Sequence, residues 1–209
     1  GDVTIVADPA ADSSRPRWSA DGKKIAFAKY IEGQGYRVFT ANADGSGQTQ
    51  ISSGPGDNDR DPAWSPDGSK IVYSSAADGD LDLWIMNADG TNPTQLTNDA
   101  DNDDGAAWSP DGTRIAFTRL ATADQNGVWY MNADGTGQTL IPGTGNAKLQ
   151  SPASVSWSPD GTMVAYSLAV GGIRIVKLDG TVVRTLTPAG LSEFGGVEWS
   201  PDGTQLAFD

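Results

Sequence analysis

Cysteine and histidine are both absent from this chain of 209 residues, and each absence removes a class of chemistry. Without cysteine the chain has neither disulfides nor thiolate metal ligands, so cysteine usage says nothing about its redox compartment. Without histidine it has no Ser-His-Asp or Cys-His nucleophile and no imidazole ligand for zinc or copper. We therefore expect a protein that is not an enzyme, and the alternative that these absences leave is a hydrolase that uses carboxylates alone.

Long hydrophobic runs and basic residues are also scarce. No apolar run approaches the ~20 residues of a membrane-spanning helix, and no basic and apolar leader opens the chain. The 27 acidic residues outnumber the 14 basic ones, which gives a net charge of -13. That balance disfavours nucleic acid and anionic membrane surfaces as partners. We expect no membrane span, and a partner that is another protein or a basic or neutral ligand.

What the chain has instead is a repeated phrase. Trp-Ser-Pro-Asp-Gly begins at four tryptophans, and a near copy begins at a fifth; the five are Trp18, Trp64, Trp108, Trp157 and Trp199. They recur about every 45 residues, a period typical of repeat architectures. Ser-Pro-Asp-Gly matches a type I turn, with Ser first, Pro second and Gly fourth. The phrase therefore predicts a structural role: the tryptophans pack in the core, and the aspartates stabilise turns.

Each repeat contains four short segments typical of β-strands. The first ends at the phrase tryptophan, and the second is an apolar triplet found at 25–27, 71–73, 115–117, 164–166 and 206–208. A third segment precedes Asn-Ala-Asp-Gly or a degraded copy of it, and a weaker fourth follows. Four antiparallel strands per repeat describe one blade of a β-propeller. The expected fold class is all-β, and the expected domain is a single propeller over residues 1–209.

The repeats occupy 18–63, 64–107, 108–156 and 157–198, and a fifth repeat is split between 199–209 and 1–17. Segment 4–6 lies as far before Trp18 as segment 94–96 lies before Trp108, so it has the position of a fourth strand. We expect five blades, with the N-terminal strand closing the last one. The alternative is a fragment of a propeller with six or more blades, which leaves an open sheet edge. We expect a monomer, with edge-mediated oligomers as the alternative.

The combination of Trp-Ser-Pro-Asp-Gly, Ile-Ala-Phe, Met-Asn-Ala-Asp-Gly and Leu-Thr resembles the TolB-type or PD40 repeat, a WD-repeat-like β-propeller family. The resemblance covers almost the whole chain. It implies an exported bacterial protein, periplasmic or secreted, that acts in protein interaction. Two features depart from the family: the α/β domain that precedes the propeller in TolB has no counterpart here, and the repeats number fewer than six.

The loops between the second and third strands, and those between one repeat and the next, vary in length and chemistry. Because these loops share one face of a propeller, we expect recognition there. The candidate contact residues are Arg15, Arg17, Tyr30, Tyr36, Asp57 and Asp59, since tyrosine and arginine are enriched at binding hot spots. Their alternative role is that of ordinary surface residues.

One acidic loop has the composition of a calcium site. Asp99, Asp101, Asp103 and Asp104 offer closely spaced carboxylates, and Ca²⁺ takes six to eight oxygen ligands. The loop is not an EF-hand, because Gly105 falls one place late and the twelfth position is Pro110. The alternative is a solvated acidic loop. We expect no other cofactor.

Three functions follow from the sequence. The first is a non-catalytic module that binds a protein or ligand through the variable loops. The second is a propeller that binds glycans or hydrolyses glycosides with two carboxylates. The third is an accessory propeller of a larger exported enzyme, such as a prolyl-oligopeptidase-like peptidase.

Overall fold

The structure is a computed structural model that describes residues 13–54, 58–121, 126–145, 154–168, 172–187 and 196–208. These residues form β-strands joined by turns and loops, and no helix among them could cross a membrane. The contacts divide the chain into two compact units, residues 1–98 and residues 99–209. Each unit is described separately below.

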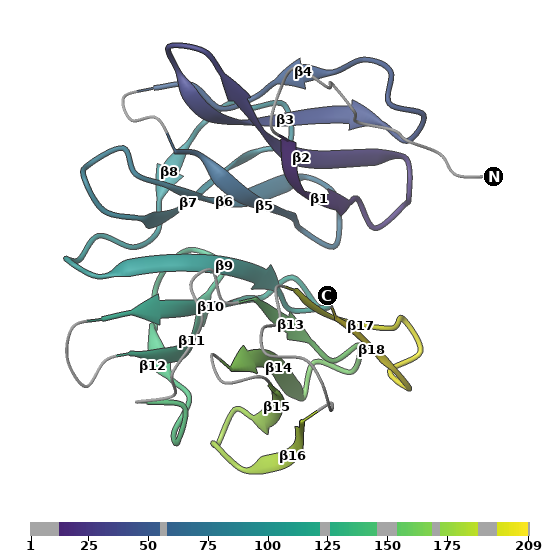
Figure 1. Cartoon of the computed structure of the whole chain (residues 1–209), viewed down its shortest axis with the longest axis vertical. Helices are drawn as coiled ribbons and strands as arrows, with labels where there is room; N and C mark the ends of the chain where they lie inside the picture. The colour runs from purple at the N-terminus through teal and green to yellow at the C-terminus, as the bar shows by residue number, and fades with distance from the viewer. Residues whose placement is uncertain are drawn as a thin grey trace. The chain divides into compact units, whose positions relative to one another are not determined.

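The first unit holds two antiparallel sheets of four strands, drawn in purple to teal in Figure 1. The strands of its first sheet are β1 (Ser13–Trp18), β2 (Lys24–Ile31), β3 (Gly35–Asn42) and β4 (Thr49–Gln50). Those of its second sheet are β5 (Arg60–Trp64), β6 (Lys70–Ser75), β7 (Asp82–Asn87) and β8 (Thr94–Gln95). In both sheets the strand order follows the chain, so every neighbouring pair is a hairpin.

The second unit repeats this arrangement twice and adds a shorter sheet, drawn in teal to yellow in Figure 1. One sheet contains β9 (Asn102–Trp108), β10 (Arg114–Leu120), β11 (Gly127–Asn132) and β12 (Thr139–Leu140). The next contains β13 (Val155–Trp157), β14 (Met163–Leu168), β15 (Gly172–Lys177) and β16 (Val182–Leu186). The last pairs β17 (Val197–Trp199) with β18 (Leu206–Phe208).

The predicted all-β fold of four-stranded antiparallel sheets is confirmed. Each apolar triplet lies in a second strand, because β-branched and aromatic residues suit a strand that is buried on both faces. The strand predicted to close the fifth blade, residues 4–6, lies outside the described residues. The five-blade closure therefore stays a prediction.

The cores form where the first strand of one sheet packs against the preceding sheet. Trp64 joins Ala26 and Val38 in one cluster, and Trp157 joins Ala116 and Val128 in another. The Trp157 indole also donates a hydrogen bond of 3.1 Å to the carbonyl of Ala107. These tryptophans pack as predicted, since they are 9% and 6% exposed respectively.

Trp18 departs from the prediction of core packing, because 53% of its surface is exposed. Each of the other phrase tryptophans follows a described sheet in the chain. Trp18 belongs to the first described sheet, so no described sheet comes before it in the chain to cover its indole.

Candidate functional site

The strands of each sheet have two ends, and the repeated turns occupy one of them. In the turn after Trp64, the hydroxyl of Ser65 donates to Asp67 Oδ1 at 2.6 Å, and the backbone N–H of Ser69 donates to the same atom at 3.0 Å. These bonds lower the pKa of Asp67 to about 2, because they stabilise the ionised carboxylate. The turn aspartates are therefore bound within their own turns, at the end opposite to the variable loops.

At the end with the variable loops, Tyr30 and Tyr36 lie across from each other on β2 and β3. Their rings meet edge to face, with centroids 5.5 Å apart and planes 71° apart. Tyr30 is still 46% exposed although its ring contacts that of Tyr36. Both tyrosines were predicted as contact residues, and the structure brings them together as one aromatic pair in which Tyr30 is exposed and Tyr36 is half-buried.

A hollow of about 490 Å³ lies beside this pair, lined by Tyr30, Gly33, Gln34, Gly35, Tyr36 and Asn58. The tight hairpin that forms its wall requires the two glycines, whose φ angles are 77° and 71°. Asn58 reaches the hollow because its segment forms a parallel bridge with Tyr36. Its walls offer two phenols and two carboxamides, and none of the six residues is charged.

Among the other predicted contact residues, Arg17 lies away from this pair. Arg17 lies opposite Ala26, about 13 Å along β2 from Tyr30 at the rise of a strand. The side chain of Arg15 and the whole of Asp57 lie outside the described residues.

Asp59, also predicted as a contact residue, is buried between the two sheets of the first unit. Its carboxylate accepts hydrogen bonds from the hydroxyls of Ser52 at 2.7 Å and Ser75 at 2.6 Å. The Arg37 guanidinium lies 3.4 Å from the same carboxylate. Only 5% of Asp59 is exposed, so its contacts are with the protein itself.

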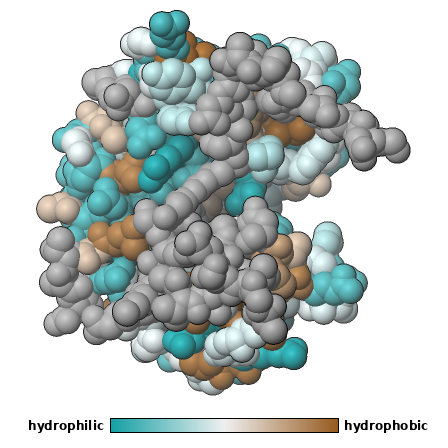
Figure 2. Space-filling view, in the orientation of Figure 1, coloured by the Kyte–Doolittle hydropathy of each residue, from teal (hydrophilic) through white to brown (hydrophobic). Residues whose placement is uncertain are grey.

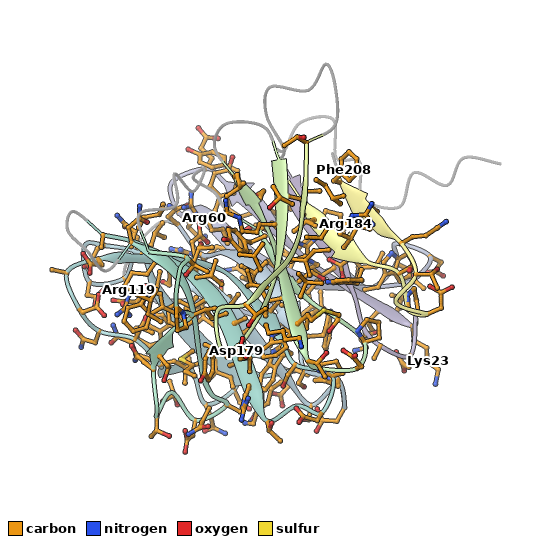
Figure 3. The ribbon with its side chains drawn as sticks, turned by 90° about the horizontal axis from the view of Figure 1, so that it is seen from below. Lys23, Arg60, Arg119, Asp179, Arg184 and Phe208 are labelled. Carbon is orange, nitrogen blue, oxygen red and sulfur yellow. The ribbon has the colours of Figure 1, made fainter. Side chains whose placement is uncertain are left out.

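In the acidic loop that the sequence favoured for calcium, the aspartates gather around a cation of the protein. Arg119, labelled in Figure 3, donates two hydrogen bonds of 2.7 Å to the buried carboxylate of Asp103. The same guanidinium lies 2.6 Å from Asp99 and stacks on Trp129. Asp104 is buried too, and its Oδ1 accepts a hydrogen bond from Gly105 N–H. A calcium ion there would have to displace this guanidinium, and the calcium site stays a prediction.

A different group of carboxylates converges between β6 and β7. Asp78, Asp80 and Asp82 place one oxygen each within 4.8 Å of one another. Asp82 has no exposed surface and accepts hydrogen bonds from Thr97 at 2.9 Å and Gln95 at 3.0 Å. Burial raises the pKa of Asp82 to about 7, and the charges of Asp78 and Asp80 add to this shift. One oxygen of Asp80 is buried and accepts no hydrogen bond from any described residue.

Asp78 and Asp80 lie between a second and a third strand of the repeat, Asp82 begins the third, and no metal site was predicted there from the sequence. The alternation Asp-Gly-Asp-Leu-Asp was the available signal, because alternate residues of an extended chain face the same side. The role of Asn58 had no such signal, since its place in the hollow depends on a bridge to Tyr36.

A family model described as the TolB beta propeller domain (PD40) matches residues 2–209. Among curated proteins, none matches the sequence.

Three solved structures resemble the fold. A chain in the crystal structure of a nidogen/laminin complex is 15% identical, with a TM-score of 0.79, 98% of this chain covered and 74% of that one. TolB from Acinetobacter baumannii is 21% identical, with a TM-score of 0.71, 85% of this chain covered and 43% of that one. The putative TolB from Agrobacterium tumefaciens is 20% identical, with a TM-score of 0.73, 95% of this chain covered and 69% of that one. At these identities the likeness is one of fold.

Proposed function

Because the chain belongs to the TolB beta-propeller (PD40) family, we propose that it is a non-catalytic binding module of an exported bacterial protein. Its variable loops would contact another protein, with the Tyr30–Tyr36 pair as the centre of the contact. The observation that carries this proposal is the aromatic pair, with Tyr30 exposed, beside the uncharged hollow.

Three properties of the pair suit it to binding. Tyrosine is enriched at interface hot spots, because it offers a large rigid ring together with a hydroxyl. The hairpin beneath it is fixed by eight paired positions between β2 and β3, so a partner would meet a preformed surface. The hollow beside the pair is hydrophilic as well, since it offers two phenols and two carboxamides, and on the face shown in Figure 2 teal and white side chains are common among those described. The chain has a net charge of -13, so a neutral or basic partner segment matches it best.

The test is capture of exported bacterial proteins on the immobilised chain, followed by affinity measurement with the purified partner. Tyr30→Ala should weaken binding about thirtyfold, the effect of removing a hot spot of about 2 kcal/mol. Val183→Ala is the matched control, because Val183 is 48% exposed and lies far along the chain on β16. Equal affinity of the two variants would remove Tyr30 from the contact.

A glycoside hydrolase that uses two carboxylates has weaker support. Asp82 has the raised pKa of a general acid, and two carboxylates lie near it. Its side chain, however, is fully buried and both of its oxygens accept hydrogen bonds, so it has no surface to offer a substrate. Turnover of a panel of aryl glycosides by the chain would contradict our proposal.

Divalent-cation binding is a second candidate function, favoured by the grouping of Asp78, Asp80 and Asp82. Carboxylate oxygens are the ligands that Ca²⁺ prefers, and no described basic side chain forms an ion pair with these three. A bound cation would also offset the mutual repulsion of the carboxylates.

Thermal unfolding with and without Ca²⁺ separates the two acidic loops. Calcium at about 100 times its dissociation constant stabilises a folded protein by about 2.7 kcal/mol. We expect this stabilisation to vanish in Asp80→Asn and to persist in Asp99→Asn. The opposite pattern would assign calcium to the loop predicted from the sequence, and no shift in the unmodified protein would end the cation proposal.

A further inference from the structure

Asp-Gly pairs are unusually frequent in this chain. They begin at Asp21, Asp44, Asp67, Asp78, Asp89, Asp104, Asp111, Asp134, Asp160, Asp179 and Asp202. In such a pair the glycine N–H can approach the aspartate side chain closely, because glycine has no Cβ in the way. The glycine nitrogen attacks the carbon of the protonated carboxyl group, the C–OH bond breaks, the hydroxyl leaves with the amide proton as water, and a succinimide ring closes. One water then opens the ring at either carbonyl and yields aspartate or isoaspartate, with no net change in mass.

In nine of these pairs the turn holds both reacting groups. The glycine N–H donates to the carbonyl three residues earlier at 2.8 to 3.0 Å, as in Gly68 to Ser65. The aspartate Oδ1 accepts from the backbone N–H two residues later at 2.9 to 3.0 Å. Hydrogen bonds from turn hydroxyls or backbone also lower the pKa of all nine aspartates. The turn bonds hold both reacting groups in place, and a lowered pKa leaves less of the protonated carboxyl that ring closure consumes, so these nine pairs resist ring closure.

Asp104 is protected in another way. It lies inside β9, opposite Thr118 of β10, and only 1% of it is exposed. The Gly105 N–H donates to Asp104 Oδ1 at 2.8 Å, but burial limits the water that must open a succinimide ring, and Thr118 donates a hydrogen bond to the Asp104 carbonyl.

Asp78 has neither the short turn hydrogen bonds of the nine pairs nor the burial of Asp104. The N–H of Gly79 lies 3.4 Å from the Ala76 carbonyl, longer than any of the nine turn bonds. The Asp78 side chain is exposed. Among the described residues, Gln95 Nε2 donates a hydrogen bond of 2.7 Å to its carboxylate. A Cβ built on Gly79 would meet no atom within 4 Å, so a ring has room to form. Gly22 and Gly68 also have open space, which makes the hydrogen bonds the deciding difference.

We propose that Asp78, in the loop between β6 and β7, is the aspartate of the Asp-Gly pairs that converts to isoaspartate first in the folded protein. The conversion adds one methylene to the loop backbone and moves the remaining carboxylate. It would therefore take one of the three oxygens out of the Asp78–Asp80–Asp82 group. This proposal does not depend on the proposed binding function.

The experiment ages the folded chain at mildly acidic pH, labels isoaspartate with an isoaspartyl methyltransferase and maps the label to peptides. Asp78 should accumulate isoaspartate about tenfold faster than any of the nine turn aspartates, since each of those must first break its turn hydrogen bonds. Equal rates, or a faster turn aspartate, would overturn the proposal. Deamidation at Asn126, which precedes Gly127, is distinguished by its increase in mass.

Two controls separate the fold from the local sequence. In urea, all eleven pairs should react at similar rates, and a persistent lead of Asp78 there would show that the fold is not the cause. In the folded state, Asp78→Glu should remove most of the label, because the longer side chain must close a larger ring. Unchanged total label in that variant would also overturn the proposal.

Discussion

Aspartate occurs in this chain in two opposite environments. Asp67 is exposed, and the donors of its own turn lower its pKa to about 2. Asp82 is buried, and the loss of hydrating water raises its pKa to about 7 despite hydrogen bonds from Thr97 and Gln95. The direction of the shift thus depends on whether desolvation exceeds hydrogen bonding at each position.

Asp82 should make stability fall as pH rises. Its pKa is about 7 in the folded state and near 3.8 in the unfolded state, so the folded state retains a proton that the unfolded state releases between these values. Its contribution to the free energy of unfolding is fully present below about pH 4 and is lost as pH rises through 7. Asp82→Asn should remove this dependence and unfold at higher urea than the unmodified protein above pH 7.

Asp67→Asn is the matched control for this measurement. Because the pKa of Asp67 is lowered, its contribution is present above about pH 4 and is lost only as pH falls toward 2. Urea midpoints of the control should therefore show an unchanged slope between pH 4 and 7. A flat profile for the unmodified protein across that window would contradict the assignment to Asp82.

At the scale of the elements, a turn glycine of one sheet lies in close contact with the backbone of the preceding sheet. An added Cβ at Gly90, in the turn between β7 and β8, would collide with the carbonyl of Ile51, next to β4. Gly180 has the same relation to Pro142 in the second unit. Each of these two turns thus requires its glycine for two reasons, a positive φ angle and close contact with the preceding sheet.

Gly90→Ala tests this docking against Gly68→Ala. Both glycines have positive φ, 86° and 70°, so both variants carry a strain of about 1 kcal/mol. Gly68 faces open space, whereas Gly90→Ala must also push the two backbones apart, at a further cost of about 1–3 kcal/mol. Urea unfolding should rank Gly90→Ala well below Gly68→Ala, and equal midpoints would disprove the contact.

At the scale of the whole molecule, the five-blade closure makes a prediction about residues 4–6. If this segment completes the sheet of β17 and β18, Ile5→Pro removes a ladder hydrogen bond and should lower the melting temperature and promote self-association. Ala11→Pro, outside the predicted strand, is the control. Light scattering after size exclusion should show a monomer for the unmodified chain, and identical behaviour of both variants would contradict the closure.

The repeats of the sequence determined the strands and turns because the interactions that form them are local. Ser65, Asp67 and Ser69 lie within five residues, and the apolar triplets mark the second strands without knowledge of their neighbours. The tyrosine pair was also predictable from the sequence, since Tyr30 and Tyr36 flank the turn of one hairpin. Its hollow was not, because Asn58 lies in the segment between β4 and β5, and only its bridge to Tyr36 brings it to the hairpin.

Only the tertiary structure decided which acidic residues have a basic partner. Asp99, Asp101, Asp103 and Asp104 are as dense in the sequence as Asp78, Asp80 and Asp82, yet Arg119 supplies the counter-charge for Asp99 and Asp103. That arginine lies on the next strand, 16 residues after Asp103, and meets it through the pairing of β9 with β10. A local pattern counts carboxylates, whereas the burial and the partner that set their charge come from strands that folding brings alongside.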